Sequence, residues 1–190
     1  MAKRLDPDHC CGVIVDVQDY FLSQLDGDRR SQILTNTQDF ARLLGLFRIP
    51  VVATLEKPVE TNGALPQQIG DELNDLSKIF EKAFFDLSRE KPISDHIASL
   101  NRRQIVIAGC ETDVCVLQSC LGLLSQDYEV YLVENLLFTS SSDATAAIAR
   151  MKAEGAIFVS YKTLFYELAA TVGNEKIQDM PGPLPKDLAG

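Results

Sequence analysis

The sequence predicts an α/β protein, a three-layer α/β/α sandwich around a six-stranded parallel sheet with a Rossmann-like strand order. Short apolar runs rich in β-branched residues recur along the chain, a composition typical of strands buried on both faces of a parallel sheet. Segments with helical spacing of apolar residues lie between these runs. The length of 190 residues suits one domain with one sizeable core.

Five strands are predicted clearly, at residues 11–16, 50–54, 104–108, 129–133 and 156–160. A sixth strand, residues 77–82, is indicated only by alternation of polar and apolar side chains. Helical periodicity marks residues 33–44 and 116–124, and a further helix is expected to begin near Lys162. Strands that alternate with helices favour right-handed crossovers, and therefore a parallel sheet covered on both faces.

The whole chain, residues 1–190, is expected to form a single domain, because no change in composition divides it. Residues 172–190 differ in character, since Gly173, Pro181 and Pro185 interrupt any helix that continues into them. This tail is either loose or docked on a neighbouring subunit.

The charge balance restricts the possible partners. The chain has 18 Lys and Arg against 27 Asp and Glu, a net charge of −9, so it lacks the basic surface that binding to nucleic acid requires. No stretch approaches the roughly 18 apolar residues of a membrane span. Because the amino terminus has no apolar leader region, a cytoplasmic location is the default expectation.

Five cysteines are present, an odd number in a chain too large to need disulfides for its stability. They form no C-x-x-C pair and no Cys/His pattern typical of zinc sites, so no metal or other cofactor is expected. Four of them, Cys10, Cys11, Cys110 and Cys120, are interpreted as small buried apolar residues. Cys115 is the exception, because of its position in the predicted fold.

Three ionisable residues of different types fall at predicted strand ends, where ligands bind in doubly wound sheets: Asp16, Lys82 and Cys115. Cys115 is expected in the first turn of a helix, where backbone N–H groups and the helix dipole would lower the pKa of its thiol and could hold an oxyanion. Asp16 leaves an apolar strand, and partial burial would raise its pKa towards the range of a general base. Lys82 is a cation in an apolar neighbourhood.

Three segments carry a resemblance to a known family. Asp16-Val-Gln-Asp-Tyr-Phe21, Lys82-Ala-Phe84 and Gly109-Cys-Glu-Thr-Asp-Val-Cys115-Val resemble, in order, the signatures of the isochorismatase-like cysteine hydrolases. The similarity extends from about residue 11 to residue 168. The combination of the three motifs is more specific than any one of them.

The resemblance implies a catalytic triad of Asp16, Lys82 and Cys115, in which Asp16 accepts the thiol proton and Lys82 stabilises the thiolate. It also implies a cis peptide bond between Cys110 and Glu111, with the N–H groups of Glu111 and Cys115 forming an oxyanion hole. The implied reaction is hydrolysis of the C–N bond of a small amide or carbamoyl compound through a thioester on Cys115. A small-molecule substrate and a homo-oligomer are further implications.

The chain departs from the nicotinamidases of this family, which bind a metal through an Asp-x-His pair after the second strand. Residues 54–58 read Thr-Leu-Glu-Lys-Pro here, and the chain's histidines are His9 and His96, so no metal site is expected. Four apolar residues are candidates for lining a small apolar substrate pocket, namely Phe21, Leu55, Phe84 and Phe138.

Other functions are compatible with the same motifs. A vinyl-ether hydrolase of the isochorismatase type would use the carboxylate as an acid and would not need the thiol. A catalytically silent, oligomeric binding protein would keep the fold without turnover. A thiol redox protein is disfavoured, because Cys120 lies five residues beyond Cys115 on the predicted helix and points away from it.

Overall fold

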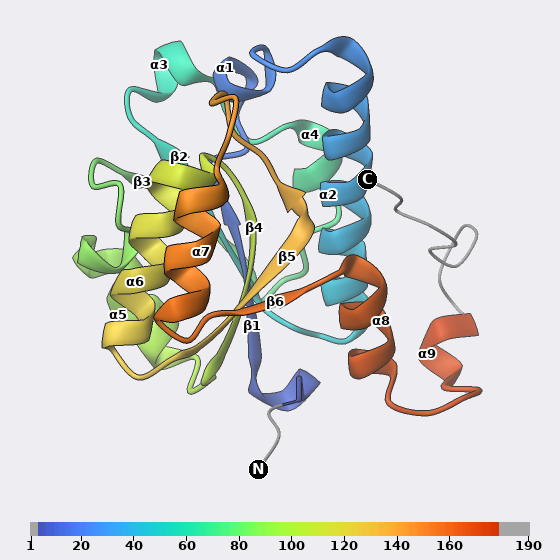
Figure 1. Ribbon diagram of the computed structural model, residues 1–190. Helices are drawn as coiled ribbons and strands as arrows, with labels where there is room; N and C mark the ends of the chain where they lie inside the picture. Colours follow the sequence, from blue (N-terminus) through green and yellow to red (C-terminus); the bar gives the residue numbers. More distant parts are fainter. Residues whose placement is uncertain (1–3, 179–190) are drawn as a thin grey trace.

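The computed structural model describes residues 4–178 and contains the predicted six-stranded sheet, in which every pairing is parallel (Figure 1). The strands are β1 (Cys10–Val15), β2 (Val51–Glu56), β3 (Lys78–Lys82), β4 (Gln104–Gly109), β5 (Glu129–Leu137) and β6 (Ile157–Val159). Their order is β3-β2-β1-β4-β5-β6, which confirms the predicted doubly wound class. The order reverses at β1, which pairs with both β2 and β4, so a binding site is expected beyond the ends of these strands.

Helices cover both faces of the sheet (Figure 1). The α-helices are α1 (Asp19–Leu22), α2 (Gly27–Leu46), α3 (Val59–Asn62), α4 (Gln67–Gly70), α5 (Lys91–Ser99), α6 (Leu117–Ser125), α7 (Thr145–Ala153), α8 (Tyr161–Ala169) and α9 (Glu175–Gln178). Two 3₁₀ turns, Pro7–His9 and Leu87–Arg89, and a π-helical turn, Thr112–Val116, complete the described elements. Helices α2 and α8 pack on one face and α5, α6 and α7 on the other, so each face has its own apolar cluster.

The central strand β1 is apolar on both faces because helices cover both, and all six of its residues are buried. Gly12 lies against α2, because a Cβ atom at this position would overlap the side chain of Leu44. Helix α2 begins after Asp26, whose carboxylate accepts the N–H of Arg29 at 2.9 Å and so caps the helix.

Strand β3 shows why its sequence signal is weak. It forms one edge of the sheet, and Lys82 is the one buried residue among its five. An edge strand with polar side chains lacks the apolar run of a central strand. Strand β5 continues four residues past its predicted end, to Leu137, whereas β6 is shorter than predicted. The predicted helix around Cys115 begins instead with the π-helical turn.

The predicted tail, residues 172–190, includes the short helix α9, and residues 179–190 lie outside the described part of the chain. Among residues 4–178, no helix is both long enough and apolar enough to cross a membrane.

Candidate active site

Asp16 follows β1 directly and has a left-handed backbone conformation, with a φ of 50°. Its N–H donates to the carbonyl of Thr54 at 3.1 Å, which ties the turn to β2. Its carboxylate is fully buried, and one oxygen accepts the Thr54 hydroxyl at 2.8 Å. The strand end therefore holds a carboxylate inside the protein with a defined orientation.

Lys82 ends β3 and lies opposite Glu56 in the parallel register of β2 and β3. Its side chain is fully buried, and Nζ lies 2.7 Å from Oδ2 of Asp16. Nζ also lies 3.6 Å from Oε2 of Glu56. A buried ammonium needs such partners, because an unpaired charge in the interior is strongly disfavoured.

Cys115 is brought to these groups by the loop after β4. Gly109 has a φ of 121° and lies so close to Val15 that a Cβ atom would overlap its backbone. The next peptide bond, between Cys110 and Glu111, is cis. The thiol of Cys115 is buried, 3.6 Å from Lys82 Nζ.

The structure thus brings together the three residues that the sequence singles out, and it adds Glu56, which the sequence analysis missed. The Cys115 thiol donates to Oε2 of Glu56 at 3.1 Å. Glu56 ends β2, so the rule that directed attention to the ends of β1 and β3 could also have found it. We call Asp16, Glu56, Lys82 and Cys115 the thiol cluster.

Gln18 holds the backbone of Glu56 in place. Its side-chain oxygen accepts the Glu56 N–H at 2.7 Å, and its amide group donates to the Glu56 carbonyl at 3.2 Å and to the Gly63 carbonyl at 2.7 Å. Gln18 is fully buried. Gln18, which belongs to the first sequence motif, therefore positions the end of β2.

The pKa values of the thiol cluster follow from burial and from mutual charge. Burial raises the pKa of Asp16 above its usual 3.8, and the nearby Lys82 charge offsets only part of this change. Burial tends to lower the pKa of Lys82, but the charges of Asp16, Cys115 and Glu56 outweigh it and the pKa is raised. Burial raises the pKa of the Cys115 thiol, and the negative charges of Asp16 and Glu56 raise it further.

The sequence-based prediction of a lowered thiol pKa is therefore wrong for this geometry. Burial and two carboxylates outweigh the single ammonium of Lys82. In addition, Cys115 is the fourth residue of the π-helical turn rather than part of an α-helical first turn. The resting sulfur keeps its proton, so forming a thiolate requires a proton acceptor within reach.

The loop that carries Cys115 is anchored from the end of β5. The Glu111 carboxylate accepts the Thr139 hydroxyl and the Ser140 N–H, both at 2.7 Å. Asp113 Oδ1 lies 2.6 Å from the same hydroxyl oxygen, whose one proton can be donated to either carboxylate. The Glu111 carbonyl accepts two N–H groups that flank Cys115, those of residues 114 and 116. These bonds fix the backbone beside the sulfur.

Three groups could in principle bind a metal ion, since Asp16, Glu56 and Cys115 each place one ligand atom within 4.8 Å of the others. However, Lys82 Nζ lies 2.7 Å from Asp16 and 3.6 Å from the other two. The ammonium already supplies the positive charge among these atoms. The donor set therefore does not fit a resident metal unless Lys82 moves away.

The four predicted pocket residues fall into two groups. Phe21, Leu55 and Phe138 are buried in the apolar cluster that includes α2 and α8. Phe84 is 44% exposed, and its ring lies 4.8 Å from the guanidinium of Arg89. Phe84 is thus the one of the four that is open to solvent beside Lys82, and the role of all four in substrate binding stays a prediction.

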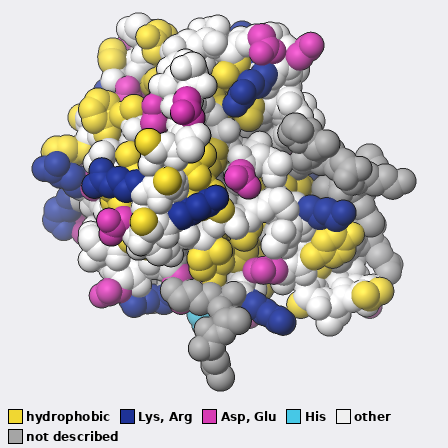
Figure 2. All heavy atoms as spheres, viewed as in Figure 1, with side chains coloured by type: hydrophobic (Ala, Val, Ile, Leu, Met, Phe, Trp, Pro, Cys, Tyr) yellow, Lys and Arg dark blue, Asp and Glu magenta, His cyan; other side chains and the backbone are white. Residues whose placement is uncertain are grey.

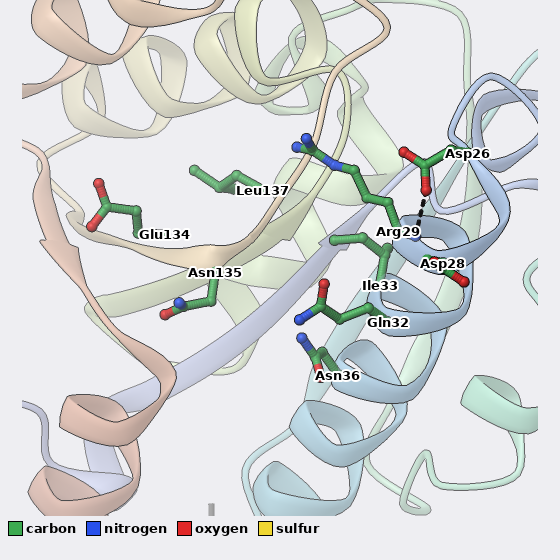
Figure 3. Close-up of a pocket in the computed structure, with 9 residues that line it drawn as sticks. All are labelled: Asp26, Asp28, Arg29, Gln32, Ile33, Asn36, Glu134, Asn135 and Leu137. Carbon is green, nitrogen blue, oxygen red and sulfur yellow. Dashed lines mark hydrogen bonds between the residues drawn. The ribbon is translucent and has the colours of Figure 1, made fainter. Parts of the chain in front are cut away.

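A cavity of about 550 Å³ lies away from the thiol cluster, between α2 and the end of β5 (Figure 3). Arg29 extends from α2 towards Leu137 of β5, and Glu134 and Asn135 line the same side as Leu137. The lining residues are Asp26, Asp28, Arg29, Gln32, Ile33, Asn36, Glu134, Asn135 and Leu137. Charged and amide side chains are frequent among these residues, and none of the three motif residues lines the cavity.

The site is thus a thiol, an ammonium and a carboxylate buried together at the carboxyl ends of the strands of a doubly wound parallel sheet, the architecture of an α/β protein. The chain belongs to the isochorismatase family, because the model of the isochorismatase domain matches residues 10–163. This confirms the resemblance that the three motifs indicated.

One curated relative carries the same family description, and two solved structures share the fold. The chain is 27% identical over 182 residues to the secreted isochorismatase effector Isc1 of Phytophthora sojae, covering 93% of this chain and 85% of the relative. Its fold is similar to that of the MAR1 ribonuclease from Caenorhabditis elegans, with a TM-score of 0.85, 22% identity and coverage of 93% and 90%. It is also similar to the YcaC gene product of Escherichia coli, described as an octameric hydrolase of unknown specificity (TM-score 0.82, 20% identity, coverage 90% and 84%).

Proposed function

We propose that this isochorismatase-family chain is a cysteine hydrolase that cleaves the C–N bond of a small amide or carbamoyl compound through a thioester on Cys115. One observation carries the proposal. The Cys115 sulfur lies 3.6 Å from a buried ammonium and 3.1 Å from a carboxylate oxygen. A thiol with a cation to stabilise its negative charge and a carboxylate to take its proton is the arrangement that nucleophilic catalysis requires.

The proposed reaction has two halves. The thiol proton passes to a carboxylate, the sulfur electron pair forms a bond to the carbonyl carbon, and the C=O π pair moves to oxygen. The N–H groups of Glu111 and Cys115 are proposed to stabilise this oxyanion. Collapse breaks the C–N bond, and the nitrogen takes the proton and leaves as ammonia or an amine. Water then cleaves the thioester, releasing the acid and restoring the thiol.

The roles follow the geometry of the thiol cluster. Lys82 stabilises negative charge on the sulfur, and Asp16 is its buried counter-ion. The resemblance assigns Asp16 as the acceptor of the thiol proton. No step uses a metal, in keeping with the position of Lys82 among the three ligand-type groups.

The test is intact-protein mass spectrometry during turnover of a panel of primary amides and carbamoyl compounds. We expect an acyl adduct on Cys115, accompanied by release of ammonia. Cys115→Ser should lower turnover by roughly 10⁴-fold, the scale seen when a catalytic nucleophile is removed. Cys120→Ala, which changes another buried thiol, is the matched control and should keep turnover.

Ammonia release at an unchanged rate by Cys115→Ser would overturn the proposal. Hydrolysis of a vinyl ether by this variant would favour the isochorismatase-type reaction, in which a carboxylate acts as the acid. A panel without any turnover or adduct, together with tight binding of a small molecule, would favour the silent binding protein.

We also infer that the chain acts as a homo-oligomer. The similar YcaC protein is described as octameric, and exposed apolar side chains lie close to the motif residues in sequence: Tyr20, Phe84, Phe85 and Val114. Such side chains are typical of surfaces that another subunit covers.

We infer a small-molecule substrate rather than nucleic acid. Basic and acidic side chains are interspersed on the face shown in Figure 2, and the net charge is −9. The ribonuclease description therefore stays with the Caenorhabditis elegans protein. The cytoplasmic location stays a prediction, since one relative is described as secreted.

A further inference from the structure

We propose that Glu56 selects the substrate by charge, so that the thiol cluster accepts neutral or cationic amides and disfavours amides with a negative charge near the carbonyl group. This inference rests on the proposed hydrolase function and narrows its substrate class. Asp16 keeps the role of proton acceptor that the resemblance implies, and its side chain is within hydrogen-bonding distance of the Cys115 thiol. Glu56 is therefore a second carboxylate at the sulfur, which the proton transfer does not use.

The Glu56 carboxylate lies directly beside the reacting sulfur. Its Oε2 atom is 3.1 Å from the Cys115 thiol. A carbonyl carbon must come within about 3–3.5 Å of the sulfur before the bond between them forms. The groups attached to that carbon then lie within a few ångströms of the Glu56 carboxylate, so its charge acts on them at short range.

The charge of Glu56 is not balanced within the thiol cluster. The charged groups that act on the sulfur are Asp16, Lys82 and Glu56, which are two carboxylates and one ammonium. The ammonium lies closer to Asp16, at 2.7 Å, than to Glu56, at 3.6 Å. Transfer of the thiol proton to Asp16 moves charge within the cluster and leaves the sum unchanged. The site that receives the substrate therefore carries one net negative charge.

Glu56 is the most exposed member of the thiol cluster. Its side chain is 20% exposed, whereas the side chains of Asp16 and Lys82 are fully buried. Within residues 4–178, its second oxygen, Oε1, accepts no hydrogen bond from the protein. A carboxylate with an available oxygen on the solvent side can accept an N–H or an ammonium group of an arriving molecule, and it repels another carboxylate.

The backbone around Glu56 keeps this carboxylate in place. Gln18 forms hydrogen bonds with both the N–H and the carbonyl group of Glu56. The parallel register of β2 and β3 sets Glu56 opposite Lys82. A charge held in one position discriminates against like charge by repulsion, and this repulsion is stronger where little water remains.

The charged side chains of the segment after β3 leave this negative charge in place, because they include one group of each sign. Arg89 lies 4.8 Å from the ring of Phe84. The Glu90 carboxylate accepts the N–H groups of Ala83 and Phe84, at 2.6 and 3.1 Å. The cation and the anion are adjacent in the chain, so they offset each other.

The test compares two alkylating reagents of nearly equal size, neutral iodoacetamide and anionic iodoacetate. Both react with the same thiolate and release iodide, so the ratio of their rates at Cys115 does not depend on the thiol pKa. Peptide mass spectrometry measures each rate, and the ratio is divided by that of the neutral thiol 2-mercaptoethanol. The wild type should favour the neutral reagent at least ~5-fold in this normalised ratio, and Glu56→Gln should reduce the preference to within about 2-fold.

Glu81→Gln is the matched control. Glu81 precedes Lys82 on β3, so its side chain leaves the opposite face of the strand, where it pairs with Lys57 at 3.6 Å. This variant should keep the wild-type ratio. Glu56→Asp retains the charge and should keep most of the preference. An unchanged ratio in Glu56→Gln would overturn the proposal, and so would an equal shift in Glu81→Gln, which would reveal an effect of overall charge.

A measurement on the wild type alone covers the case in which Glu56→Gln does not fold. The reagents are 2-aminoethyl methanethiosulfonate, a cation, and 2-sulfonatoethyl methanethiosulfonate, an anion. Relative to 2-mercaptoethanol, Cys115 should favour the cation at least ~5-fold. Equal relative rates would overturn the proposal.

Turnover tests the same selection on amides. Succinamide and succinamate differ in one group, which is a second amide in the first and a carboxylate in the second. The ratio of kcat/KM for succinamate to that for succinamide should rise at least ~5-fold in Glu56→Gln. An equal change for both amides would show that Glu56 acts on the thiol alone, and it would overturn the proposal. If the wild type hydrolyses no amide, the hydrolase proposal fails, while the alkylation ratios still decide whether Glu56 selects by charge.

Discussion

Two ion pairs of nearly equal length lie in very different surroundings. Asp16 and Lys82 approach to 2.7 Å and are fully buried at the carboxyl ends of the sheet's strands. Glu72 and Arg42 approach to 2.6 Å, with about a quarter of each side chain exposed, and they join α2 to the segment after α4. The pKa of the buried acid is raised and that of the half-buried acid is lowered.

The cause of the difference is desolvation. Burial outweighs the attraction of Lys82 at Asp16, whereas at Glu72 the hydrogen bonds from Arg42 outweigh a smaller burial effect. The Arg42 pair stabilises the fold, while the Lys82 pair keeps a cation beside Cys115 at a cost in stability. The comparison therefore separates an ion pair that water can reach from one that is buried beside Cys115.

The largest expected effect comes from removing the cation of each pair. Lys82→Met leaves a buried carboxylate without a counter-ion, and the free energy of unfolding should fall by about 3–5 kcal/mol. The loss should grow with rising pH, as Asp16 is forced to ionise. In Arg42→Met the acids that lose their partner remain in contact with water, so the free energy of unfolding should fall by about 1 kcal/mol. Urea unfolding of both variants measures the difference, and equal losses would contradict the comparison.

A smaller effect is expected from the hydrogen bonds that support each acid. Thr54 donates to Asp16 at 2.8 Å, and Gln38 donates to Glu72 at 3.0 Å. Thr54→Val leaves a buried carboxylate oxygen without this donor and should lower the free energy of unfolding by about 1–3 kcal/mol. In Gln38→Met water can replace the lost donor, so the free energy of unfolding should fall by less than about 0.5 kcal/mol. The same urea titration applies, and a larger loss in the Gln38 variant would be inconsistent with the burial argument.

The smallest expected effect is on how the free energy of unfolding changes with pH, where Glu72 and Asp16 should contribute with opposite signs. A lowered pKa in the folded state makes Glu72 stabilising above its usual 4.5, and this contribution is lost as pH falls. Asp16 has a raised pKa in the folded state, so its contribution to the free energy of unfolding is fully present below pH 3.8. That contribution is lost as the pH rises. Unfolding is measured between about pH 3 and pH 6 for wild type, Glu72→Gln and Asp16→Asn.

The stability gap between wild type and Glu72→Gln should widen with pH, by less than about 1 kcal/mol. The gap between wild type and Asp16→Asn should narrow over the same range. Slopes of the same sign would show that the two acids share one environment, against the burial difference in the structure.

Most of the fold could be predicted because its strands are buried on both faces and therefore show as apolar runs. Strand β3 was predicted only weakly, since at the sheet edge just one of its five side chains needs to be buried. The far part of β5 was missed, because Glu134 and Asn135 interrupt its apolar pattern. The pattern of apolar residues in a sequence reflects which side chains are buried. β3 and the far part of β5 are hydrogen-bonded into the sheet although some of their side chains are exposed, so this pattern is weak there.

The site could be predicted in part for the same reason. Asp16, Lys82 and Cys115 stand at strand ends and in recognisable motifs, so they were found. Glu56 was missed because one acidic residue at a strand end resembles any solvated carboxylate in the sequence. Its contact with the thiol depends on the register of β2 against β3, which no local pattern contains.

The family, the doubly wound sheet and the choice of Cys115 among five cysteines could all be inferred from the chain's residues alone, because local composition and motif spacing carry that information. The electrostatics of the Cys115 thiol, in contrast, could be read only from the folded chain. Its pKa depends on which charges lie within a few ångströms and how much water remains, and these are set by strand register and burial. That is why the sequence predicted a lowered pKa at Cys115 and the folded chain, with two carboxylates around one ammonium, raises it.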